Sequence, residues 1–191
     1  MFKLRELEKN DISVINKWRN NPDIISSLGA PFRYINQDVD EKWFDNYMIN
    51  RGNSVRCAVL FNDNLVGLVS LTSIDTLNRS AEFHIMIGDI SSQNKGAGSF
   101  ATNEMLNHAF NNLNLHRISL SVLEDNTRAQ HVYEKVGFKK EGVLRKVFFK
   151  NGIYVNAFIY SILKNEYKNS LGGGNDRIIF FMQPNYLRWC A

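Results

Sequence analysis

The stretch EFHIMIGDISSQNKGAGSFATNEMLNHAFN, residues 82–111, decides the fold of this chain. Residues 82–87 form a strand-like apolar run, and residues 102–111 predict a helix. Between them, QNKGAG at residues 93–98 places two glycines where the chain leads into that helix. Glycines let a backbone approach a ligand closely, and the free N–H groups of a helix start favour negative charge. The stretch therefore predicts a loop that binds a diphosphate group.

This loop differs from two known phosphate-binding sequences. The chain has no G-x-x-x-x-G-K-[ST] sequence, which argues against a P-loop. A dinucleotide-binding fold has G-x-G-x-x-G after its first strand, whereas residues 93–98 lie mid-chain and match only Q-x-x-G-x-G. Taken alone, the loop is equally typical of a mobile glycine-rich turn, so its interpretation depends on the residues downstream of it.

A second motif lies at residues 116–138. Residues 116–122 alternate like a strand, and residues 127–135 predict a helix that Asn126 caps. The helix is expected to end at Val136-Gly137-Phe138. As a pattern, the segment is L-x-V-x-x-x-N-x-x-A-x-x-x-Y-x-x-x-G-F.

In this order, the two motifs resemble the GCN5-related N-acetyltransferases (GNAT), in particular the branch with ribosomal-protein alanine and spermidine acetyltransferases. The resemblance covers residues 2–168 and is nearest to spermidine acetyltransferases over residues 79–167. It implies an enzyme with acetyl-CoA as acetyl donor, and an α/β (α+β) fold whose mixed central sheet has splayed parallel strands and flanking helices. Further matching segments are LREL (4–7), WRN (18–20), GLV (67–69), AEF (81–83), EG (141–142) and NG (151–152).

The rest of the chain supplies the elements of one mixed α/β domain, residues 1–168. Residues 169–191 form a Gly-rich spacer and an apolar tail that the resemblance does not cover, and the role of this tail stays open. The remaining helices are expected at 12–19, 24–28 and 38–50, and the remaining strands at 2–7, 55–61, 65–73, 79–87, 138–147 and 152–162. The apolar side expected for helix 38–50 consists of Val39, Trp43, Phe44, Tyr47 and Met48.

Composition narrows the functional classes. The 191 residues are 44% hydrophobic and 22% charged, as in an ordinary globular domain. The sequence shows neither a membrane span nor a signal peptide, so we expect a cytoplasmic protein without a membrane partner. A net charge of +4 without a basic block does not favour nucleic-acid binding. No metal-ligand spacing occurs, which predicts no metal, and a homo-oligomer stays open.

The resemblance also implies how the donor binds. Free backbone groups of residues 85–87 would hold the pantetheine arm, and the glycine loop would hold the diphosphate, with Lys95 as an added cation. Asn126 would contact the cofactor as well as cap its helix, and Ala129 would leave room by being small. The expected cofactor-binding residues are Ile85, Met86, Ile87, Gln93, Asn94, Lys95, Gly96, Ala97, Gly98, Ser99, Asn126, Ala129 and Tyr133.

Two residues are candidates for the acid–base chemistry of acetyl transfer. By the family pattern, Tyr133 is the general acid, since a phenol with a pKa near 10 can protonate a departing thiolate. Glu82 would bind or deprotonate the amine, with His84 as an alternative base. The competing interpretations are structural. Tyr133 would be a packed helix tyrosine, and Glu82 would form a surface ion pair. The expected substrate-binding residues are Glu82, Phe83, His84, Asn20 and Tyr34, with Phe32 and Trp43 as further candidates by position.

The resemblance implies a primary amine as acceptor, and we expect a polyamine or another small amine. An amino sugar and a protein N-terminus remain alternatives, and a non-catalytic acyl-CoA-binding module is a different class of function. Spermidine enzymes of this branch carry several acids in the matching stretch, where this chain has Asp23, Asp38, Asp40 and Glu41. Neither Cys57 nor Cys190 lies in the two motifs, which favours direct transfer without an acyl-enzyme.

Overall fold

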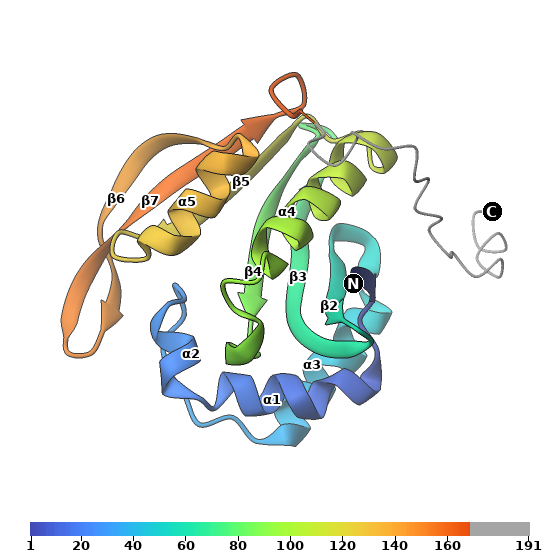
Figure 1. Ribbon diagram of the computed structural model, residues 1–191, viewed down its shortest axis with the longest axis vertical. Helices are drawn as coiled ribbons and strands as arrows, with labels where there is room; N and C mark the ends of the chain where they lie inside the picture. The colour runs from blue at the N-terminus through green and yellow to red at the C-terminus, as the bar shows by residue number, and fades with distance from the viewer. Residues whose placement is uncertain (169–191) are drawn as a thin grey trace, which may run out of the picture.

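A computed structural model describes residues 1–168 of the chain (Figure 1). Within this range a sheet of seven strands has the order β1-β2-β3-β4-β5-β7-β6, and its one parallel pair is β4 with β5. The strands are β1 (Phe2–Glu6), β2 (Val55–Phe61), β3 (Asn64–Asp75), β4 (Ser80–Ile87), β5 (Arg117–Leu123), β6 (Lys139–Lys150) and β7 (Ile153–Leu163). The α-helices are α1 (Ile12–Arg19), α2 (Pro22–Ser26), α3 (Gln37–Ile49), α4 (Ala97–Asn107) and α5 (Thr127–Val136).

The predicted order of helices and strands is confirmed, and the largest difference is at the start of α4. This helix begins at Ala97, not at residue 102. Gly96 has φ +90 and is the N-cap, so the chain turns directly into the helix and the last loop residues form its first turn. The π-helical segment η4 (His108–Asn112) continues the helix at its other end. The glycine loop and the helix start are therefore one unit.

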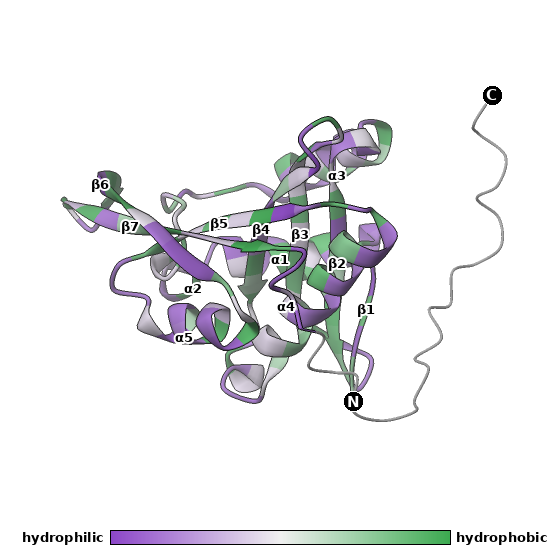
Figure 2. Ribbon diagram, turned by 90° about the horizontal axis from the view of Figure 1, so that it is seen from above, coloured by the Kyte–Doolittle hydropathy of each residue, from purple (hydrophilic) through white to green (hydrophobic). Residues whose placement is uncertain are grey.

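Helices cover both faces of the sheet, and each face has its own apolar core. One core, on the α4 side, includes Leu71 and Leu106. The other joins Ile15 and Phe44, from α1 and α3, to Leu68 of β3. Figure 2 shows α4 and α5 on one side of the sheet and α3 on the other. Alternation along β3 sends its side chains to the two cores in turn.

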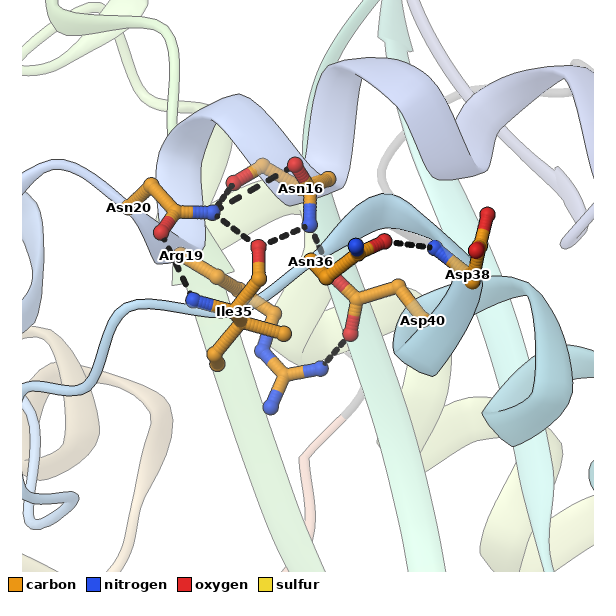
Figure 3. A network of polar contacts seen from close by, with 7 residues as sticks. All are labelled: Asn16, Arg19, Asn20, Ile35, Asn36, Asp38 and Asp40. Carbon is orange, nitrogen blue, oxygen red and sulfur yellow. Dashed lines mark hydrogen bonds and ion pairs between the residues drawn. The ribbon is translucent and has the colours of Figure 1, made fainter.

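The buried side of α3 differs from the prediction. Phe44 and Tyr47 are buried, but Val39 is 56% exposed and Met48 is 41% exposed, so their assignment to the apolar side is wrong. Asp40 is fully buried instead, because it forms an ion pair with Arg19 of α1 (Figure 3). This charged contact places the helix with residues 40, 44 and 47 inward, a spacing that keeps them on one face.

The parallel strands β4 and β5 pair only at their first residues. Ser80, Ala81 and Glu82 pair with residues 117–119, and the two strands then diverge (Figure 1). Over residues 83–87, β4 stays paired with β3 alone. One backbone edge of β4 therefore lacks a strand partner, which leaves its N–H and C=O groups free for a ligand. The expected splayed sheet is confirmed.

Candidate active site

The space between the diverging strands is a cavity of about 950 Å³, which we call the main cavity. Its walls come from all five α-helices, from β2 to β6, and from residues 27–30. A smaller cavity of about 310 Å³, the loop cavity, lies at the glycine loop. The two cavities adjoin and share the lining residues Ile87, Gln93, Gly98, Arg128 and Val132.

The start of α4 forms one wall of the loop cavity. Gly96, Ala97, Gly98 and Ser99 all line it, and the N–H groups of a first helical turn have no partner within their own helix. No protein atom lies within 4 Å of the place that a Cβ at Gly96 would take. The open space and the free donors fit a bound anion such as a diphosphate.

Residues of α5 also line the loop cavity, and two of them, Arg128 and Lys135, are cationic. Arg128, His131 and Lys135 line it, and the Arg128 Nη1 donates to Gln93 Oε1 at 2.9 Å. None of these three is among the residues that the sequence predicts. Their spacing of three and four residues, which puts them on one side of a helix, is the signal that could have indicated them. Lys95, the expected cation, is exposed and does not line either cavity.

Tyr133 lies in the wall of the main cavity, in an apolar setting. Its side chain is 7% exposed and its ring lies 6.2 Å from Phe83, 5.7 Å from Phe138 and 6.5 Å from Tyr160. Burial raises the pKa of Tyr133 to about 12. Among residues 1–168 no hydrogen-bond partner contacts its hydroxyl, so this group keeps its proton at neutral pH and is free to donate it.

Asn126 connects α5 to the segment after α2. The Ala129 N–H donates to Asn126 Oδ1 at 3.1 Å, so the predicted N-cap is confirmed. The Nδ2 of the same amide donates to the Ser27 carbonyl at 2.9 Å. Asn126 and Ala129 both line the main cavity. The second contact joins residues that are far apart in the sequence, which no local pattern indicates.

Glu82 and His84 share one face of β4, as expected. Their closest side-chain atoms, Oε2 and Nε2, lie 3.7 Å apart, and His84 Nε2 lies 2.9 Å from Thr72 Oγ1. His84 lines the main cavity, whereas Glu82 does not. Burial lowers the pKa of His84, the Glu82 carboxylate opposes this, and the Arg56 guanidinium adds to it. The balance favours the neutral imidazole, the form that can accept a proton.

Asn20 and Tyr34 lie away from both cavities. Asn20 Nδ2 donates to the Ile35 carbonyl at 2.8 Å, and the Ile35 N–H donates to Asn20 Oδ1 at 2.9 Å (Figure 3). The Asn20 amide therefore holds the loop between α2 and α3 against α1. Tyr34 is 92% exposed and its ring contacts that of Phe32. Of the aromatic candidates near the acceptor, Trp43 and Phe83 line the main cavity, whereas Phe32 does not.

Of the four acids expected near the acceptor, Asp40 and Glu41 accept hydrogen bonds from other side chains of the protein. Asp40 accepts from Asn16 Nδ2 at 2.7 Å besides its ion pair with Arg19, and Glu41 accepts from a glutamine of its own helix. Asp23 lines the main cavity, where Arg56 stacks on the Trp43 ring at 4.9 Å. Within residues 1–168, no carboxylate contacts Arg56.

Three other observations bear on the chemistry. Burial raises the pKa of Cys57 to about 12, and this thiol lines neither cavity. Among the described residues, no three His, Cys, Asp or Glu side chains gather as metal ligands would. In the same part of the chain, none of the helices has the length and apolar character to cross a membrane.

Comparison with known proteins gives a consistent set of relatives. The family model described as an acetyltransferase (GNAT) domain matches residues 2–139. Spermidine N(1)-acetyltransferase of Vibrio cholerae is 36% identical over 167 residues, covering 87% of this chain and 95% of that protein. The Escherichia coli K12 enzyme of the same name is 32% identical, covering 86% of this chain and 87% of that one. A crystal structure of the Vibrio cholerae enzyme with CoA and spermine has a TM-score of 0.82, at 36% identity, and covers 87% of this chain and 97% of its own.

Proposed function

The chain belongs to the acetyltransferase (GNAT) family, and from this premise we propose that it acetylates a primary amine of a polyamine of the spermidine type. It is an N-acetyltransferase, and acetyl-CoA is its acetyl donor. The observation that carries the proposal is the divergence of β4 and β5 around a cavity that Tyr133 lines. The Vibrio cholerae relative, which binds CoA and spermine in its crystal structure, supports a polyamine acceptor.

The residues present fit acetyl-CoA, which supplies a reactive acetyl thioester when bound. The free edge of β4 at Ile85–Ile87 would bind the pantetheine amides as another strand does. The first turn of α4 at Gly96–Ser99 would hold the diphosphate, with Arg128 and Lys135 as counter-charges. Asn126 and Ala129 lie between these two regions and leave space for the arm.

The proton chemistry is assigned to two sides of the main cavity. Tyr133 would donate its hydroxyl proton to the leaving sulfur, since its raised pKa keeps the phenol protonated. His84 or Glu82 would accept the proton that the amine loses, directly or through water. A backbone N–H of β4 would polarise the acetyl carbonyl, because its free edge faces the cavity. The transfer then needs no covalent intermediate on the enzyme.

A second candidate acceptor is an amine that also carries an anionic group, such as an amino sugar nucleotide. The observation that favours it is the charge of the main cavity, where Arg56 has no carboxylate partner among residues 1–168 and Asp23 is the acid in the wall. A guanidinium in this position would bind a phosphate or carboxylate of the acceptor and would repel a polyamine.

An acceptor panel distinguishes these proposals. Thiol release from acetyl-CoA is measured with spermidine, an amino sugar nucleotide and an Ala-initiated peptide at equal concentrations. We expect kcat/KM for spermidine to exceed the other two by about tenfold, a difference of about 1.4 kcal/mol in transition-state binding. A higher value for the sugar nucleotide would replace the polyamine with the second candidate. Absence of thiol release with every amine would contradict the proposed function.

A further inference from the structure

Three backbone carbonyl oxygens converge on the ammonium group of Lys150. The Nζ donates to the carbonyls of Ile25, Leu28 and Ala30, each at 2.8 Å. An ammonium has three N–H donors and no acceptor, so these three bonds use all of them. The carbonyls belong to the end of α2 and the residues after it, and that of Ile25 also accepts the Leu28 N–H at 3.0 Å. Lys150 is the last residue of β6, far away in the sequence.

The segment held in this way, residues 25–30, is a wall of the main cavity. Two further contacts hold it: Asn126 donates to the Ser27 carbonyl at 2.9 Å, and Gly29 packs on the ring of Phe148. A Cβ at Gly29 would lie 2.9 Å from Phe148 Cζ, which leaves no space between them. The segment residues that line the main cavity are Ile25, Ser27, Leu28, Gly29 and Ala30, and none of them lines the loop cavity.

On the basis of the proposed function, we propose that Lys150 is a positioning residue for the acceptor amine. Its ammonium binds the three carbonyls together. This contact fixes segment 25–30 at the distance from Asn126 and Tyr133 that the acceptor needs. Lys150 does not line the cavity itself, so it acts through the segment and touches neither donor nor acceptor. Without the ammonium, the three carbonyls would turn toward water and the wall would move.

Steady-state kinetics of Lys150→Ala test this role, with Lys146→Ala as the matched control. Lys146 lies on the same strand and its Nζ also donates to a carbonyl, that of Tyr154, but within the β6–β7 hairpin. We expect Lys150→Ala to raise KM for spermidine about tenfold and to change KM for acetyl-CoA less than about twofold. The control should change neither constant, and Lys150→Arg should restore only part of the loss, because a planar guanidinium does not match three carbonyls that converge on one nitrogen.

Chemical rescue tests directly whether an ammonium ion must bind the three carbonyls. Ammonium chloride should restore about half of the lost kcat/KM of Lys150→Ala, whereas tetramethylammonium chloride, which has no N–H donor, should restore none. Gly29→Ala provides an independent displacement of the segment, since its Cβ would push against Phe148. It should also raise KM for the amine while acetyl-CoA is bound normally.

Amide hydrogen exchange separates this inference from the proposed function. Exchange over residues 25–30 should be faster in Lys150→Ala than in the wild type, while exchange over α4 stays unchanged. Equal changes in both KM values, or unchanged exchange over the segment, would overturn the positioning role. If the wild type acetylates no amine, the proposed function fails, and hydrogen exchange with Gly29→Ala and Lys150→Ala still decides whether Lys150 holds the wall.

Discussion

The two ends of the active-site cavity are built in different ways. The proposed donor end is the loop cavity, whose lining comes from residues 87–99 and one face of α5. The proposed acceptor end is the part of the main cavity lined by Asp23, Trp43, Arg56, His84, Ile25 and residues 27–30. Two short segments of the chain make the first, whereas elements from α2 to β6 contribute to the second.

Because the two ends are built differently, they should respond differently to substitutions. The donor end works mainly through backbone N–H groups at a helix start, which most side chains do not alter. The acceptor end depends on side chains with distant partners, such as Lys150 on the α2 carbonyls and Asn126 on Ser27. Substitutions at the acceptor end should therefore change specificity, while the donor end should respond only where backbone geometry or the acid itself is changed.

The largest effect is expected from removal of the proposed acid, Tyr133, in the wall of the main cavity. Tyr133→Phe should lower kcat about 100-fold and change KM for acetyl-CoA less than about twofold, because the hydroxyl acts only on the leaving group. Single-turnover kinetics would measure this. Tyr160→Phe is the control, since Tyr160 is buried nearby and its hydroxyl donates to Glu134 Oε1 at 2.9 Å. Equal activity of the two variants would exclude Tyr133 as the acid.

The donor end should fail when its backbone geometry is changed. Gly96→Val should weaken acetyl-CoA binding about tenfold by calorimetry, because a β-branched residue at φ +90 costs about 1–3 kcal/mol or forces the loop to move. The strain comes from the backbone, because no protein atom would contact the new side chain's Cβ. Gly52→Val is the control: that Cβ also meets open space, but without a positive φ. Unchanged affinity in Gly96→Val would show that the loop does not hold the donor.

The smallest expected effect is a shift in the pH dependence of kcat/KM, caused by substitutions at the acceptor end. If His84 accepts the amine proton, kcat/KM should fall as pH drops through its pKa, which burial places below 6.5. Arg56→Gln removes a charge that lowers this pKa, so the acidic limb should move to higher pH. Glu82→Gln removes a charge that raises it, so the limb should move down.

These opposite shifts distinguish the two candidate bases. A roughly 100-fold loss of kcat in Glu82→Gln, without a shift, would assign the base to Glu82 instead of His84. The effect of pH on the free amine is the same for all variants, so differences between profiles report the enzyme. Identical profiles for all three proteins would remove both residues from the proton transfer.

The sequence predicted the parts of the site that depend on local structure. The strand, glycine loop and helix of residues 82–111 were recognisable, although α4 begins at Ala97 because Gly96 takes a left-handed conformation. The cap at Asn126 was also recognisable, since it needs only its own helix. Asn20 and Tyr34 were predicted from position alone, and the structure places them away from both cavities.

The sequence by itself indicated the family through the resemblance of its two ordered motifs. It also predicted the order of the elements and the glycine turn before α4, because these depend on hydrophobic periodicity and on turn residues next to each other in the chain. Only the tertiary structure decided the contacts between distant segments, at both ends of the cavity. It buried Asp40 against Arg19, turned Arg128 and Lys135 toward the loop and brought Lys150 onto the carbonyls of α2. Such contacts join residues distant in the chain, and their free energy depends on burial and mutual geometry, which exist only in the folded protein.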